Sequence, residues 1–250
     1  MFDDEGNVAR LAEYRHELER NPDNIGVIQR MASMLRVAGE YGEALQFYQR
    51  AAAHERGDGV ANALTPGRNP WGIDIACLRW LLGDRRQALQ EMHGMVAGIL
   101  DGSISYGDAA GGVSQGLLLY YMAVTTGERR EASFALEYFK NRVDQLRGVH
   151  SNLLQVWPCP IARYYLGDIE FESVMRAVNR IPTVRANPTT LELGRRRKFV
   201  AALFHDGTKQ RAHGDEEGCI TRMRECAGLD NTRIDQEWYL ARHEVERAKQ

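Results

Sequence analysis

The chain has 250 residues, of which 44% are hydrophobic and 26% charged, and its formal charge at pH 7 is −2. These values are typical of a soluble globular protein, and the small net charge gives no overall attraction to nucleic acid or to a membrane surface. No apolar run approaches the roughly 20 residues that a membrane-spanning helix needs, and the acidic start, MFDDEGNVAR, has none of the apolar character of a secretory signal. We therefore expect a cytoplasmic protein with no membrane partner.

The cysteines show neither metal-site spacing nor a disulfide framework. No C-x-x-C pair occurs, and no zinc-finger histidine pair follows a cysteine. Cys219 and Cys226 would share one helical face, but about 10 Å of helix rise separates them, which is too far for a disulfide. We expect reduced, packed thiols and no bound metal. The four cysteines are Cys77, Cys159, Cys219 and Cys226.

Five glycine–acid dipeptides recur along the chain at intervals of 40 to 47 residues. An apolar run with helical periodicity precedes each dipeptide, and a second run follows it. Glycine ends a helix in the left-handed conformation, and an acidic residue is favoured at the positive N-terminus of the next helix. The pattern predicts an all-α fold, an α-solenoid of about five antiparallel helical hairpins. The dipeptides are Gly39-Glu40, Gly83-Asp84, Gly127-Glu128, Gly167-Asp168 and Gly214-Asp215.

The first and last predicted helices, at 7–20 and 235–249, are both charged and amphipathic. An open stack of repeats needs a polar helix to cover each apolar end. We therefore expect both segments to act as caps, and a dedicated binding helix is the alternative for each.

The first hairpin, within residues 22–56, carries the clearest repeat pattern. Ala32 and Ala44 place small side chains where two antiparallel helices would cross closely, while Tyr41 and Tyr48 would fill the groove toward the next hairpin. These small and aromatic residues fall at the matching positions of a tetratricopeptide repeat, and the segment resembles that family. The resemblance implies a superhelix whose role is binding rather than catalysis.

The same frame projects onto four further units, although each is longer than the 34 residues of a tetratricopeptide repeat. Small residues occupy eight of the ten predicted crossing positions, with Pro160 and Cys219 counted as small, and the two exceptions, Tyr120 and Glu172, fall in the third and fourth units. We expect residues 1–250 to form one helical-repeat domain. Its later units are 69–98, 112–147, 153–180 and 195–228.

The surplus residues lie in connectors rich in glycine, asparagine and proline. Such connectors emerge on one edge of a solenoid, where insertions commonly carry recognition, and plain spacer loops are the alternative. Gly111 and Gly112 could present amide groups to a phosphate at a helix start, although a flexible connector is the simpler interpretation. The last connector contains two prolines and is not expected to be a continuous helix. The connectors are 57–70, 98–112, 148–160 and 181–194.

Sequence patterns of catalysis and of cofactor binding are absent. The chain has no H-E-x-x-H, no G-x-S-x-G, no P-loop and no dinucleotide fingerprint. His205 and Asp206 could act as an acid–base pair, but a solvated or capping histidine is the simpler interpretation. We predict no catalytic residue and no cofactor.

Charge is distributed unevenly, because residues 176–211 carry nine basic side chains and two acids. This local field would steer an acidic partner, and the predominance of arginine favours recognition of carboxylates. Aromatic residues for base stacking are sparse here, which disfavours nucleic acid. The alternative is a solvated surface. The core of this basic patch is Arg195, Arg196, Arg197 and Lys198.

The resemblance to tetratricopeptide repeats also implies that the first helix of each hairpin lines a concave face. Its positions hold residue types that dominate binding energetics at interfaces, notably tryptophan, tyrosine and arginine. The alternative for Trp80, Tyr121 and Tyr164 is that they are buried core aromatics. The implied partner-binding residues are Arg30, Ser33, Arg36, Asp74, Trp80, Tyr121, Tyr164, His205 and Arg211, with Cys77 and Thr208 at equivalent positions.

Three functions remain open from the sequence. The leading hypothesis is a non-catalytic module that binds a protein or peptide in its concave groove. A second is an immunity-type inhibitor that blocks a bacterial toxin or effector. The third is an enzyme or small-ligand binder whose site converges around Asp74, His205 and Arg211.

Overall fold

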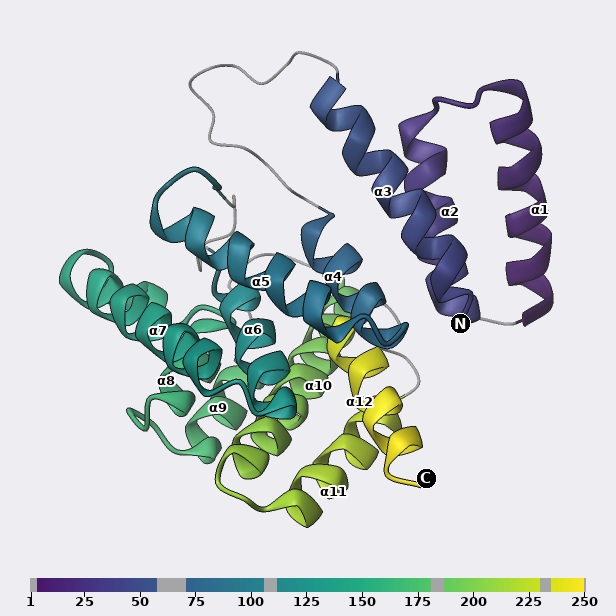
Figure 1. Cartoon of the computed structure of the whole chain (residues 1–250). Helices are drawn as coiled ribbons and strands as arrows, with labels where there is room; N and C mark the ends of the chain where they lie inside the picture. The colour runs from purple at the N-terminus through teal and green to yellow at the C-terminus, as the bar shows by residue number, and fades with distance from the viewer. Residues whose placement is uncertain (1–3, 58–70, 106–111, 181–186, 230–234, 250) are drawn as a thin grey trace.

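A computed structural model describes residues 4–57, 71–105, 112–180, 187–229 and 235–249. Within these residues the chain forms twelve α-helices and one short 3₁₀ helix, and no β-strand (Figure 1). The predicted all-α fold is therefore confirmed. The helices are α1 (Asp4–Arg20), α2 (Ile25–Ala38), α3 (Tyr41–Gly57), α4 (Gly72–Leu81), α5 (Arg85–Leu100), α6 (Val113–Thr126), α7 (Arg129–Val149), η1 (Ser151–Gln155), α8 (Cys159–Tyr165), α9 (Phe171–Val178), α10 (Pro188–Ala212), α11 (Glu216–Ala227) and α12 (Gln236–Arg247).

The helices from α2 to α11 pair in sequence order into five hairpins, and one of the five predicted glycines lies between the two helices of each hairpin. All five have positive φ angles, between 74° and 90°, which an L-residue adopts only at a cost. In the fifth hairpin Asp215 also caps α11, since its side chain accepts a hydrogen bond of 2.8 Å from the amide of Gly218. In the fourth hairpin the acid does not open the second helix. Instead, α9 begins at Phe171, and Asp168 pairs with Arg147 at 2.9 Å.

Close helix crossings depend on small residues, as the repeat pattern predicts for the first hairpin. Ala32 and Ala44 are both fully buried there. In the fifth hairpin a Cβ on Gly207 would lie 3.1 Å from the carbonyl oxygen of Cys219, so α10 and α11 approach closely at that point. In the third hairpin the close approach is made by Gly116, four residues before the projected Tyr120, because a Cβ there would clash with the rings of Tyr138 and Phe139.

The projected frame fails in the fourth hairpin, where Glu172 is exposed rather than packed at a crossing. The start of α10 also differs from the expected unit, which began at residue 195. The helix begins at Pro188, where the preceding Asn187 accepts a hydrogen bond of 2.8 Å from the amide of Thr189. Part of the connector 181–194 is therefore helical, and residues 181–186 lie outside the described part of the chain.

The two terminal helices differ from each other in their packing. Helix α1 packs against α2 and shares a hydrophobic cluster with α2 and α3. Helix α12 packs on α11 of the last hairpin and also contacts α4 and α10 (Figure 1, yellow), and its residues Arg242, Glu246 and Arg247 are exposed. Its four consecutive residues from Trp238 to Ala241 are all buried. Because α10 also contacts α6, the first helices of several hairpins converge on α12.

Candidate functional site

The residues expected on the concave face are brought together by α12, beginning with those of the first two hairpins. Arg36 on α2 and Asp74 on α4 form a nearly buried ion pair, and Gln236 on α12 donates a hydrogen bond of 3.0 Å to the same carboxylate. The guanidinium of Arg36 also stacks on the ring of Tyr239, 5.3 Å from its centroid. Burial raises the pKa of Asp74, and the charge of Arg36 opposes that shift. A partner would reach this ion pair only if α12 moved away.

A second cluster joins α4, α6, α10 and α12 through buried hydrogen bonds. The indole of Trp80 donates to the hydroxyl of Tyr121 at 3.2 Å, and that hydroxyl donates to Glu244 at 2.8 Å. Arg211 then pairs with Glu244 at 2.9 Å and donates to Thr125 at 3.0 Å. Trp80 and Tyr121 have no exposed surface, so the expectation that they lie on an exposed face is wrong. The alternative interpretation, that they are buried core aromatics, is correct for both.

The two neighbouring tyrosines of α8 form polar contacts with side chains of α10. Tyr164 donates a hydrogen bond of 2.6 Å to Asp206, and Tyr165 contacts Nδ1 of His205 at 2.8 Å. Nε2 of His205 lies 3.8 Å from Glu237 on α12. His205 is fully buried, which overturns the expectation of a solvated or capping histidine. Thr208 and Cys77 are buried as well.

The three residues of the enzyme hypothesis have separate partners. Asp74 pairs with Arg36, His205 with Tyr165, and Arg211 with Glu244. No hydrogen bond or ion pair among the described residues joins Asp74, His205 and Arg211 to one another. The same described residues contain no group of three or more metal-ligating side chains, and none of their helices has the length and apolarity to cross a bilayer.

The first hairpin retains an exposed part of the expected face. Arg30 on α2 is exposed, and its guanidinium lies 6.0 Å from the ring centroid of Tyr14 on α1. Ser33 is half-buried, and its hydroxyl lies 3.1 Å from the hydroxyl of Tyr48. Of the nine expected contact residues, Arg30 is the one that the structure leaves exposed.

The basic patch lies on the first half of α10. Arg195 and Arg196 are exposed and share one carboxylate, that of Glu192, with contacts of 2.9 Å each. Their hydrogen bonds lower the pKa of Glu192 to about 2. Arg197 pairs with Asp235, just before α12, at 2.7 Å. Lys198 is half-buried, and burial lowers its pKa.

The basic patch continues onto α9. Arg195 donates a hydrogen bond of 3.4 Å to Asn179, which follows the last residue of α9. Arg176 and Arg180 are exposed on this neighbouring segment. Within the described chain, neither of them nor Lys198 forms an ion pair. We call this surface, consisting of Arg176, Arg180, Arg195, Arg196 and Lys198, the basic face.

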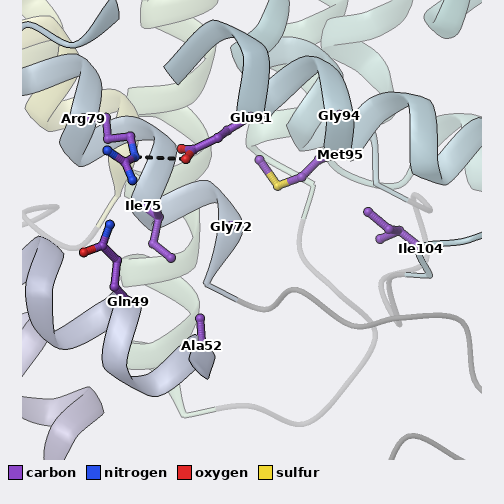
Figure 2. A pocket seen from close by; sticks show the side chains of 9 residues that line it. All are labelled: Gln49, Ala52, Gly72, Ile75, Arg79, Glu91, Gly94, Met95 and Ile104. Atoms are coloured by element: carbon purple, nitrogen blue, oxygen red, sulfur yellow. Dashed lines mark ion pairs between the residues drawn. The ribbon is translucent and has the colours of Figure 1, made fainter. Parts of the chain in front are cut away.

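A groove of about 310 Å³ lies among α3, α4 and α5 (Figure 2). Arg79 and Glu91 meet at one end of it, where Nε and Oε1 are 2.9 Å apart, and Met95 and Ile104 lie toward the other. Sequence reasoning did not find these residues, because they come from three separate elements and match no local motif. The one available signal is Gly94, a glycine inside a helical run that faces open space.

The described helices form a stack of helical hairpins, since each first helix ends at a left-handed glycine and packs against the next helix. No family model matches the chain, and no curated protein matches its sequence. Among solved structures, a tetratricopeptide repeat protein from Parabacteroides merdae ATCC 43184 is similar to it over 96% of this chain and 94% of that chain, at 12% identity and a TM-score of 0.43.

Proposed function

We propose that the chain is a non-catalytic interaction module that binds an acidic protein partner through the basic face. The observation that supports this proposal is the imbalance of charge there: Arg195 and Arg196 share the single carboxylate of Glu192, while Arg176, Arg180 and Lys198 have no ionic partner among the described residues. Exposed arginines bind carboxylates in bidentate geometry and steer oppositely charged partners toward the surface.

This proposal moves the binding surface away from the concave groove. Binding in the groove would require a partner to displace α12, together with the contacts of Tyr121, Arg211 and Asp74 to it. The basic face is accessible without any rearrangement. Nucleic acid remains disfavoured, because the chain has a net charge of −2 and the face has no aromatic residue for base stacking. An immunity-type inhibitor of an acidic toxin or effector would be one form of this function.

The test begins with capture of partners from the protein's own source by the full chain, followed by identification through mass spectrometry. The affinity of the identified partner is then measured for the double variant Arg195→Glu/Arg196→Glu over a range of salt concentrations. We expect the reversal to weaken binding at least tenfold and to flatten its dependence on salt, mainly through a slower association.

A matched control is the double variant Arg129→Glu/Arg130→Glu at the start of α7, which makes the same change of charge at two exposed arginines outside the basic face. We expect this control to bind nearly as the parent protein does. If the two double variants lose affinity equally, or if neither loses it, the basic face does not carry the interaction.

A further inference from the structure

Among the three consecutive arginines of α10, Arg197 is the one whose counter-ion is buried. The side chain of Arg197 is 50% exposed, whereas that of Asp235, 2.7 Å away, is 9% exposed. Arg195 and Arg196 instead share Glu192, whose side chain is 42% exposed. The two carboxylates therefore lie in different environments, and they should differ in how readily they take up a proton.

Asp235 makes fewer contacts than a buried carboxylate needs. It occupies the N-cap position of α12, but its side chain accepts no capping hydrogen bond there. Its Oδ2 is buried and has no hydrogen-bond partner among the described residues. The ionised form of such a carboxylate is costly, because one charged oxygen has lost its water without gaining a donor. Uptake of a proton removes that cost.

We propose that Asp235 is a proton-controlled counter-ion, which neutralises Arg197 at neutral pH and leaves the charge of Arg197 to the basic face in mildly acidic conditions. Arg197 directly follows Arg196 on α10, so its charge adds to the field of the basic face when Asp235 is protonated. An acidic partner then binds more tightly. This inference rests on the proposed function, since it describes how that surface is regulated.

The groups around Asp235 set the direction of this response. Burial raises the pKa of Asp235 to about 6, Glu237 raises it further, and the charge of Arg197 opposes the shift. Glu237 itself lies 3.8 Å from Nε2 of His205. The carboxyl of Asp235 is therefore mostly ionised at pH 8 and mostly protonated at pH 5. The other charged or titratable groups on this side are Arg36 on α2, Cys226 on α11 and, at the neighbouring Gln236, Asp74 on α4.

Glu192 provides the contrast within the same surface. The hydrogen bonds from Arg195 and Arg196 lower its pKa to about 2, so it stays ionised from pH 5 to pH 8. Replacing Glu192 or Asp235 by its amide is a matched change, because each removes one carboxylate from an arginine of α10. Only the replacement of Asp235 should mimic acidification.

The test uses the full-length protein and sucrose octasulfate, a polyanion whose sulfate esters keep their charge between pH 5 and 8. Its affinity is measured by isothermal titration calorimetry at low salt. We expect the parent protein to bind it about threefold more tightly at pH 5 than at pH 8, because the surface gains one positive charge. Asp235→Asn should keep only the smaller dependence that the histidines of both proteins cause. Glu192→Gln should bind more tightly than the parent by the same factor at both pH values.

Carbon-13 NMR of the aspartate carboxyl groups measures the titration of Asp235 without any ligand. We expect its midpoint at about pH 6, and Arg197→Gln should move the midpoint upward because it removes the opposing charge. The proposal is overturned if the parent does not bind the probe more tightly at pH 5, if Asp235→Asn keeps the full dependence, or if Asp235 titrates at about pH 4 like an exposed carboxyl. The proposed function is judged separately, by the captured partner and the variant Arg195→Glu/Arg196→Glu at one pH.

Discussion

Tyr121 on α6 donates a hydrogen bond of 2.8 Å to Glu244 on α12, although 123 residues separate them in the sequence. The same hydroxyl accepts a hydrogen bond from the indole of Trp80. This one oxygen therefore joins three helices at the centre of the molecule, and it is fully buried.

The first prediction concerns this hydroxyl. Tyr121→Phe should lower the free energy of unfolding by about 1–3 kcal/mol, because it leaves the indole N–H of Trp80 and one oxygen of Glu244 without that partner in the interior. Chemical denaturation monitored by circular dichroism measures the change. Tyr120→Phe is the control, since no hydrogen bond of the Tyr120 hydroxyl occurs among the described residues, and it should be nearly neutral. Equal effects of the two variants would contradict the assigned network.

The second prediction tests the crossing of the first hairpin. Ala44→Leu should cost about 1–3 kcal/mol, because Ala44 and the facing Ala32 are fully buried and the extra carbon atoms would overpack the site. The matched change Ala53→Leu, at an exposed position of the same helix, should leave the thermal unfolding midpoint nearly unchanged. A midpoint that is the same for both variants would show that α2 and α3 do not cross at Ala44.

The third prediction concerns the dependence of stability on pH. Burial raises the pKa of Asp235 to about 6, with a further contribution from Glu237 and opposition from Arg197. A carboxyl whose folded pKa lies above its unfolded value of about 4 binds a proton more tightly in the folded protein, so its ionisation removes stability as the pH rises between these two values. Asp235→Asn should therefore stabilise the protein at pH 8, by about 1–3 kcal/mol, and by little at pH 4.

Unfolding of both proteins in urea at several pH values measures this difference. Asp144→Asn, at an exposed carboxylate on α7, is the control and should leave the free energy of unfolding at pH 8 nearly unchanged. A loss of stability in Asp235→Asn at pH 8 would mean that the ion pair with Arg197 outweighs the cost of burying the charge.

The fourth prediction compares two helical glycines. Gly207→Ala should destabilise the protein by about 1–2 kcal/mol, because the new Cβ would lie 3.1 Å from the carbonyl oxygen of Cys219, which belongs to a helix backbone and cannot easily move. Gly148→Ala on α7 meets no atom and should stabilise it by about 0.5–1 kcal/mol. Opposite signs in differential scanning calorimetry are the expected result, and the same sign for both would place α10 and α11 further apart than described.

Local signals in the sequence predicted the hairpins well. A glycine lies between the two helices of each hairpin, and an apolar run lies on either side of that glycine. The crossing residues of the first hairpin followed from the same local reasoning. The start of α10 was missed for a different reason: Asn187 and Pro188 form a good helix start, but the proline was weighed as a helix breaker.

The candidate sites were harder to predict because they depend on contacts between distant segments. Gln236 meets Asp74 across 162 residues, and no periodic pattern signals that contact. When that contact is not known, the sequence positions of Trp80 and Tyr121 are compatible with an exposed helix face as well as with a buried one. The groove among α3, α4 and α5 was missed likewise, since its polar end joins Arg79 and Glu91 from two helices.

The position of α12 has a consequence for the synthesis of the protein. Ribosomes make α12 after all ten hairpin helices, so a nascent chain that already contains α2 to α11 still lacks the segment that covers Asp74, Tyr121 and Arg211. Until Tyr239 and Glu244 are made, Arg36 and Arg211 lack their contacts with α12. The native fold is therefore complete only after translation has passed α12. In many repeat arrays, by contrast, the early units fold independently of the later ones.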